Sequence, residues 1–128
     1  MGRIYKQFIE QEEPLFVCKR CKTHLTTRKE LWSKKFKGRT GSAYLFDSVK
    51  NLEFGEPEHR ELLSGMHEVA SAYCIEETCG MKLGWKYTGA SDINQTYKIG
   101  KIVLERKLIL IREQRNNWIV SFYYLGLF

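Results

Sequence analysis

The stretch Cys18-Lys19-Arg20-Cys21 decides how this chain is expected to fold, together with a second cysteine pair, Cys74 and Cys79. The 128 residues contain 4 cysteines, so no thiol remains outside these two pairs. Two thiol pairs contributed by distant loops are the usual ligand set of a structural, tetrahedral zinc site. The sequence therefore predicts one zinc ion, bound by Cys18, Cys21, Cys74 and Cys79, that ties the beginning of the chain to its middle.

The spacing within the pairs suits such a site. Zinc–sulfur distances of about 2.3 Å place tetrahedral sulfurs roughly 3.8 Å apart, and a tight turn with two intervening residues aims both sulfurs inward. The first pair has this spacing, and the second has four intervening residues, which is still within the observed range. Four thiolates saturate the metal, so we expect a structural site. His24 is an alternative ligand, although such a histidine more often packs or forms hydrogen bonds nearby.

The composition indicates one globular domain of an intracellular protein. Hydrophobic residues make up 43% of the chain and aromatic residues 13%, which is enough for a packed core. Residues 1–16 carry charges throughout and lack the apolar segment of a secretory signal, and no apolar run is long enough to span a bilayer. Disulfides are rare inside cells, so the cysteine pairs favour metal binding over the alternative of two disulfides.

The chain is basic, with a formal net charge of +6. Its basic residues are spread along the sequence, and the one loose cluster is formed by Lys34, Lys35, Lys37 and Arg39. A mild, dispersed excess favours a solvated basic surface over a nucleic-acid-binding patch. Nucleic acid is therefore not the expected partner.

Outside the cysteine pairs, the pattern predicts strands and no long amphipathic helix. A hairpin around Ser64-Gly65 is expected to lead into Cys74, and residues 91–97 read as a loop or short helical turn. The segment Gly38-Arg39-Thr40-Gly41 lacks the glycine spacing and the lysine of a phosphate-binding loop, so it predicts a turn between strands. The remaining expected strand segments are residues 42–54, broken at 47–48, residues 83–87 and residues 102–111.

The last ten residues, 119–128 (IVSFYYLGLF), contain no charge and are too short to span a membrane. We expect a terminal strand that adds to the sheet. The alternative is an exposed adhesive segment that needs a partner.

Five segments together resemble the Yippee domain, a zinc-binding family. The resemblance runs from residue 16 to residue 105, and the segments GRTGSAYLF and LGWKY are its most specific parts. The five segments are VCKRCKTHLTTRKEL (17–31), FKGRTGSAYLFDSV (36–49), LLSGMHEVASAYC (62–74), LGWKY (83–87) and QTYKIGKIVLE (95–105).

The family's zinc pattern is two Cys-x2-Cys pairs separated by 52 residues, and Cys18, Cys21 and Cys74 match it. The fourth position of that pattern is Glu77 here. Cys79 nevertheless keeps the family's offset to the LGW segment. The simplest alignment therefore inserts two residues before Cys79, which remains the expected fourth ligand.

The resemblance implies an all-β fold of the β-tent type, in which antiparallel sheets meet at an edge and are pinned by one structural zinc. It divides the chain into an N-terminal extension (1–15), a Yippee zinc-binding domain (16–111) and an atypical apolar C-terminal tail (112–128).

The resemblance also implies a protein of the nucleus and cytoplasm that acts as a zinc-binding protein-interaction module linked to cell division or growth control. Some family members are subunits of the large ubiquitin ligase called GID in yeast and CTLH in animals, so protein partners, including ligase subunits, are expected. The chain is not expected to be an enzyme. Methionine sulfoxide reductases with a related fold need a nucleophilic cysteine besides the four zinc ligands, and this sequence has none.

The alternative function is a sensor of small ligands or modified peptides. Trp85 and Tyr87 in LGWKY correspond in motif position to aromatic residues of the ligand cage of cereblon, and such a cage holds a cation or an imide-like ring. Residues 62–73 contain no tryptophan, so a complete cage of that kind is not expected. Core packing beside the zinc loops is the competing interpretation of these two residues.

Overall fold

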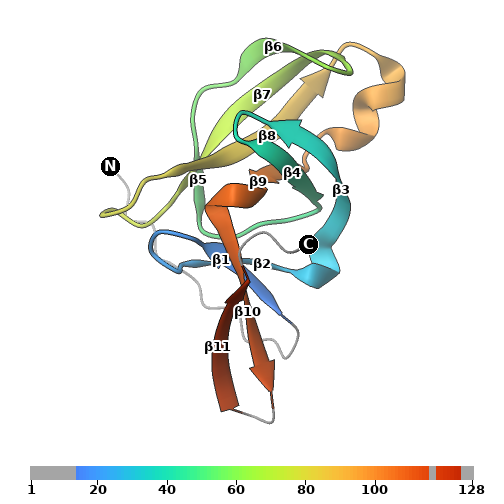
Figure 1. Cartoon of the computed structure of the whole chain (residues 1–128). Helices are drawn as coiled ribbons and strands as arrows, with labels where there is room; N and C mark the ends of the chain where they lie inside the picture. The colour runs from blue at the N-terminus through green and yellow to red at the C-terminus, as the bar shows by residue number, and fades with distance from the viewer. Residues whose placement is uncertain (1–13, 116–117, 125–128) are drawn as a thin grey trace.

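Two antiparallel β-sheets make up the part of the chain that the computed structural model describes, residues 14–115 and 118–124. A four-stranded sheet lies below a seven-stranded sheet in the view of Figure 1. Neighbouring strands within these residues pair antiparallel throughout both sheets. The structure confirms the predicted all-β class, while residues 1–13 of the expected N-terminal extension lie outside the described part.

The four-stranded sheet joins the first described strand to the last. β1 pairs with β2 on one side and with β10 on the other, and β10 also pairs with β11. The expected terminal strand is thus present as far as Tyr124, and residues 125–128 lie outside the described part. In spatial order the strands are β11 (Trp118–Tyr124), β10 (Ile109–Arg115), β1 (Leu15–Cys18) and β2 (His24–Thr27).

The seven-stranded sheet is built around β7. One edge of β7 pairs with β8 along most of its length, and the other edge pairs first with β6 and then with β5. The predicted hairpin leading into Cys74 is therefore present as β6 and β7. Along the sheet the strands are β3 (Leu31–Gly38), β4 (Gly41–Phe46), β9 (Ile102–Glu105), β8 (Lys82–Ala90), β7 (Gly65–Cys74) and β5 (Leu52–Phe54), with β6 (Glu58–Leu62) also on β7.

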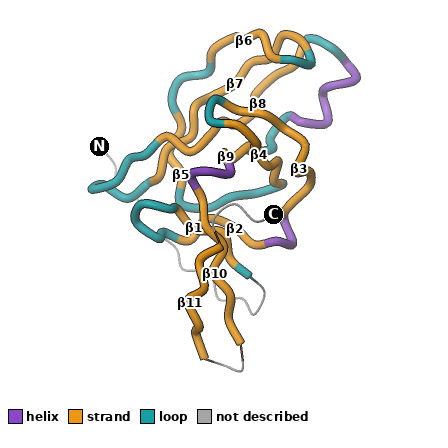
Figure 2. Tube along the Cα trace, in the orientation of Figure 1, coloured by secondary structure: helices purple, strands orange, loops and turns teal. Residues whose placement is uncertain are grey.

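Short 3-10 helices are the only helical segments of the described residues (Figure 2). The longest begins after Asp92, whose side chain accepts a hydrogen bond from the backbone N–H of Asn94. It corresponds to the helical turn expected at 91–97. No helix in the described part is long and apolar enough to cross a membrane. The three helices are η1 (Arg28–Glu30), η2 (Ile93–Lys98) and η3 (Arg106–Leu108).

The two sheets pack through a hydrophobic cluster that includes two of the cysteines. Cys18 and Cys74 are 0% and 1% exposed within it. The rings of Phe16 and Phe46 meet edge to face, 5.1 Å apart, across the interface between the sheets. The metal-binding loops are therefore continuous with the core. The other buried members of this cluster are Leu25, Tyr44, Leu83, Ile102, Leu104, Ile109 and Ile111.

A second cluster covers the opposite face of the seven-stranded sheet. Alternation along β4 sends Tyr44 and Phe46 to the first cluster and Ala43 and Leu45 to the second, as expected for a strand buried on both faces. The other buried members of the second cluster are Val69, Trp85, Tyr87 and Val103, with Phe36 and Leu62 packed against them.

A β-bulge in β8 separates Leu83 from the aromatic residues that follow it. Tyr73 pairs with Lys82, whereas Ala72 pairs with Gly84, so Leu83 is an extra residue in the ladder. Residues two apart normally share a face. Because of the bulge, Leu83 packs in the first cluster and Trp85 in the second.

The Gly38–Gly41 segment is the predicted turn between strands, and it joins β3 to β4. Two of its polar donors are occupied by the chain itself, because the backbone N–H and the hydroxyl of Thr40 both donate to Oε1 of Glu105, at 2.7 and 2.5 Å. Glu105 is 4% exposed. The carboxylate of Glu105 therefore already uses the donors of Thr40 that a phosphate-binding loop would offer to a phosphate.

Gly84 lies where β8 closely approaches the backbone of β9. A Cβ atom at this position would lie 1.8 Å from the carbonyl oxygen of Val103. Backbone atoms cannot move aside as the end of a flexible side chain can. The glycine of LGWKY is therefore required by packing.

We expect Gly84→Ala to lower the free energy of unfolding by about 3 kcal/mol or more, because the backbone of β9 would have to shift. Gly55→Ala is the matched control, because its nearest neighbouring atom would lie 3.7 Å from the new Cβ, and a change below about 1 kcal/mol is expected there. Urea unfolding of the zinc-loaded proteins measures both. Equal stability of the two variants would contradict the close approach.

Candidate metal centre

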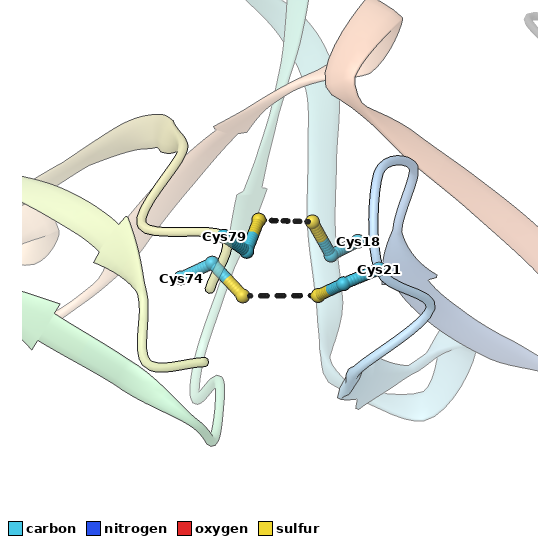
Figure 3. Close-up of side chains that lie close together, drawn as sticks. All are labelled: Cys18, Cys21, Cys74 and Cys79. Atoms are coloured by element: carbon cyan, nitrogen blue, oxygen red, sulfur yellow. Dashed lines mark hydrogen bonds between the residues drawn. The ribbon is translucent and has the colours of Figure 1, made fainter. Parts of the chain in front are cut away.

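The four cysteine side chains converge on one point between the two sheets (Figure 3). Sγ of Cys18 lies 3.7 Å from Sγ of Cys79, and Sγ of Cys21 lies 3.5 Å from Sγ of Cys74. All four sulfurs lie within 4.8 Å of one another. Cys18 ends β1 and Cys74 ends β7, so each pair belongs to a different sheet. The structure thus brings together every residue of the predicted metal site.

The arrangement fits zinc in distance and in chemistry. Sulfurs around a tetrahedral zinc lie roughly 3.8 Å apart, whereas disulfide-bonded sulfurs lie about 2.05 Å apart. All four cysteines are free thiols. Soft thiolate ligands in a tetrahedral set select zinc over hard cations such as magnesium.

Both cysteine loops are closed by the same type of backbone hydrogen bond. The N–H of Cys18 donates to the carbonyl of Thr23, and the N–H of Cys74 donates to the carbonyl of Met81, each at 2.9 Å. Four residues lie between Cys18 and Thr23, whereas six lie between Cys74 and Met81. The insertion expected from the sequence therefore lies wholly inside a closed loop.

The final turn of each loop is also preserved. The N–H of Lys22 donates to the carbonyl of Cys18 at 2.8 Å, and the N–H of Gly80 donates to the carbonyl of Glu76 at 3.0 Å. Lys22 and Gly80 each follow a cysteine and have φ values of 65° and 58°. The second turn therefore starts at Glu76, and the two extra residues are absorbed between Cys74 and that turn.

The protonation of the thiols is interdependent. The neighbouring Cys74 thiol lowers the pKa of Cys18 to about 5, against the opposing effect of burial, and the backbone N–H groups of Cys21 and Arg20 add to the lowering. Cys18 in turn raises the pKa of Cys74, and burial raises the pKa of Cys79. Without a cation the cluster cannot hold four negative charges, so full deprotonation requires a bound metal ion.

Basic residues of the first loop lie beside the cluster. Nη1 of Arg20 donates to the carbonyl of Cys79 at 3.3 Å and so links the two loops directly. Nζ of Lys22 donates to the carbonyl of Lys19 at 2.7 Å. These positive charges offset the negative charge that four thiolates leave around a zinc ion.

His24, the alternative ligand, lies outside the cluster. Its Nε2 lies 2.8 Å from Nη2 of Arg112, and a guanidinium group can only donate. His24 therefore serves as a hydrogen-bond acceptor in the four-stranded sheet.

Comparison with known proteins identifies the family. The sequence model described as "Yippee zinc-binding/DNA-binding /Mis18, centromere assembly" matches residues 14–118. The chain belongs to the Yippee/Mis18 family.

Protein yippee of Drosophila melanogaster is 44% identical over 109 residues, covering 85% of this chain and 88% of that protein. Protein yippee-like 3 of Danio rerio is 41% identical over 117 residues, covering 91% and 94%. A yippee-like protein of Arabidopsis thaliana is 43% identical over 105 residues, covering 82% and 84%.

A solved structure gives the same result for the fold. The crystal structure of the Mis18 "Yippee-like" domain superposes with a TM-score of 0.62 and covers 80% of this chain and 98% of that one. Sequence identity in this comparison is 11%, so it shows the fold alone. The antiparallel sheets of this Yippee-family chain are thus the family's architecture, with the four clustered cysteines between them.

Trp85 and Tyr87 lie further along β8, away from the metal loops. Their side chains are 6% and 2% exposed, and both line a cavity of about 1040 Å³. The cavity is lined by β3, the β6–β7 hairpin, β8 and η2 and is partly open to solvent. Its apolar wall also includes Phe36 and Tyr97. The two residues therefore both pack in the second cluster and face a cavity.

Lys98, which lies among these aromatic rings, was not singled out by the sequence pattern. Lys98 is 3% exposed, and its Nζ donates to Oγ of Ser64 at 2.7 Å. Nζ also lies 5.3 Å from the ring centres of Phe36 and Tyr87 and 5.9 Å from that of Tyr97. Burial lowers the pKa of Lys98. Of the two aromatic residues named from the sequence, Tyr87 thus lies against a cation of the chain itself, together with Phe36 and Tyr97.

We expect Cys79→Ser to lower zinc affinity by about 100-fold or more and to abolish cooperative unfolding, because one of four thiolate ligands is lost. Cys18→Ser should behave in the same way. Competition with a chromophoric chelator, followed by circular dichroism, measures both effects.

Glu77→Ala is the control for this loop, since Glu77 occupies the family's usual fourth position but is exposed and outside the cluster. Zinc affinity should remain at the wild-type level. If Cys79→Ser also kept that level, the fourth ligand would have to be another group.

Proposed function

We propose that this Yippee-family chain is a zinc-stabilised protein-interaction module with no catalytic activity of its own. The observation that carries the proposal is a group of exposed apolar side chains on β3, the β6–β7 hairpin and η2. We call this group the apolar rim. It consists of Trp32, Leu63, Met66, Ile93, Tyr97 and Ile99.

The rim holds most of the large apolar side chains that are exposed in the described residues; of the seven such residues, only Phe54 lies elsewhere. Leu63 is 94% exposed and Ile93 is 81% exposed. Trp32 stacks on Tyr97 with ring centres 5.3 Å apart, although both remain partly exposed. Concentrated apolar and aromatic side chains of this kind mark protein-contact surfaces.

Two of the elements that carry the rim, η2 and the β6–β7 hairpin, are joined by hydrogen bonds. Ser91, just before η2, donates from its backbone N–H and its hydroxyl to the carbonyl of Met66. Lys98 at the end of η2 donates to Ser64 in the hairpin. A partner would therefore meet a preorganised surface, which reduces the entropy lost on binding.

Zinc has a structural role in this proposal. The metal loops lie at the Cys74 end of β7, while the hairpin that carries part of the rim lies at its Gly65 end. Four thiols committed to the metal leave no cysteine for a reductase mechanism. Binding activity requires only that the sheets be held in place.

The partner and setting follow from the family resemblance. We propose that one partner is the multisubunit ubiquitin ligase called GID or CTLH, that the chain is an accessory or regulatory subunit there, and that it acts in the nucleus and cytoplasm in the control of growth or cell division. Nucleic acid is not a proposed partner, because the basic residues are dispersed along the sequence.

Affinity purification of the tagged chain from its native cells, followed by quantitative mass spectrometry, tests the proposal. We expect ligase subunits to be enriched, and Ile93→Asp to reduce their recovery about tenfold, since a charge would be placed at the contact surface.

Phe54→Asp is the matched control, because Phe54 is exposed and apolar but lies on β5, outside the rim. Its recovery of partners should equal that of the wild type. Recovery of other proteins without ligase subunits would refute the ligase assignment, and equal losses with both variants would refute the rim as the contact surface.

A further inference from the structure

Lys98 is a buried cation that forms no ion pair with any described residue. Its hydrogen bond to Ser64 uses one of three N–H donors of the ammonium group. The neighbouring aromatic faces contribute attraction to the charge. None of these contacts supplies a negative charge, which is the usual partner of a buried lysine.

Burial disfavours the charged form of Lys98. Removal from water lowers the pKa of its ammonium group, and no neighbouring carboxylate raises it again. Glu61 also lines the cavity, but it is exposed and forms no ion pair with Lys98. An anion placed beside Lys98 would offset the free-energy cost of removing its ammonium group from water.

The lining of the cavity around Lys98 carries more positive than negative side chains. Nε1 of Trp85 is buried and has no hydrogen-bond partner. Lys98 lines the same space, and its Nζ carries a full positive charge there. Lys35 and Lys37 add positive charge to the lining, against the one carboxylate of Glu61.

We propose that this cavity binds an organic carboxylate carried on an apolar body, with Nζ of Lys98 as the charged contact. The apolar body would pack against Phe36, Leu62 and Tyr97, which line the same space. The ligand is an anion and not a cation, because Lys98 already occupies the position between the aromatic rings. A free small acid and the terminal carboxylate of a peptide share this chemistry.

The inference goes beyond the proposed function and does not rest on it. Leu63 and Tyr97 belong to both the rim and the cavity lining. Protein contacts on the rim nevertheless do not require a bound acid, and the cavity could bind an acid in the absence of a partner protein. Failure of a ligand titration would therefore leave the partner-capture result unchanged.

Titration of the zinc-loaded, ¹⁵N-labelled chain with 4-phenylbutyrate tests the proposal, because the indole N–H resonance of Trp85 reports on this cavity alone. The uncharged analogue 4-phenylbutyramide is the matched ligand. A short peptide ending in phenylalanine, with either a free or an amidated C-terminus, forms the second pair. We expect saturable shifts with at least one free carboxylate, and binding at least about tenfold weaker for its amide.

Lys98→Met supplies the second readout, since it removes the charge and keeps a long apolar side chain. Affinity for the carboxylate should fall by about tenfold or more. Lys50→Met makes the same change of charge at an exposed position outside the cavity and should leave affinity unchanged.

Binding of the small acid identifies a free acid as a ligand, and binding of the peptide alone identifies a chain end. Equal affinity for acid and amide, retained affinity in Lys98→Met, or no saturable shift with either carboxylate would overturn the proposal. The comparison of acid with amide uses the wild-type chain, so it tests carboxylate binding even if Lys98→Met does not fold.

Discussion

The meeting of two thiol pairs, one from each sheet, is the constraint on which the rest of this structure depends. Cys18 and Cys74 are members of the hydrophobic cluster that packs the sheets together, so metal binding and core formation are one event. The free energy of zinc binding is then part of the free energy of folding. Because Cys21 and Cys74 enclose a 52-residue segment, residues 22–73, the metal also reduces the entropy of the unfolded chain.

The parts of the fold that could be predicted are those with strong local signals. The β6–β7 hairpin has turn residues between apolar runs, and the break before β5 has Asp47-Ser48. β2 and β3 were not predicted. No residue of β3 is fully buried: Trp32 and its three lysines are exposed and the others are half-buried. Two irregularities in its pairing with β4 also interrupt the period. Such an edge strand is specified by its neighbours in space and leaves little pattern in the sequence.

The metal site and the cavity differ in the same way: the first has strong local sequence signals and the second depends on residues far apart in the sequence. The cysteines could be predicted because few residue types bind zinc and each pair is local. The cavity could not, because Lys98 and Ser64 are 34 positions apart and nothing in the local sequence distinguishes a buried lysine from an exposed one. Trp85 and Tyr87 remained ambiguous because the bulge at Leu83 decides which face of β8 they occupy. A bulge is defined by how two strands pair, so the cavity can be recognised only once the sheet is assembled.

The loop that begins at Cys74 shows how little a metal site restricts the chain between its ligands. Lengthening a closed ring from four to six residues costs about 0.4 kcal/mol in loop entropy, which corresponds to less than a twofold change in affinity. The hydrogen bond from Cys74 to Met81 and the turn starting at Glu76 hold the sulfurs in place whatever lies between them. This loop is thus a position where chain length can drift during evolution under weak selection, while the chelate that it completes stays the same.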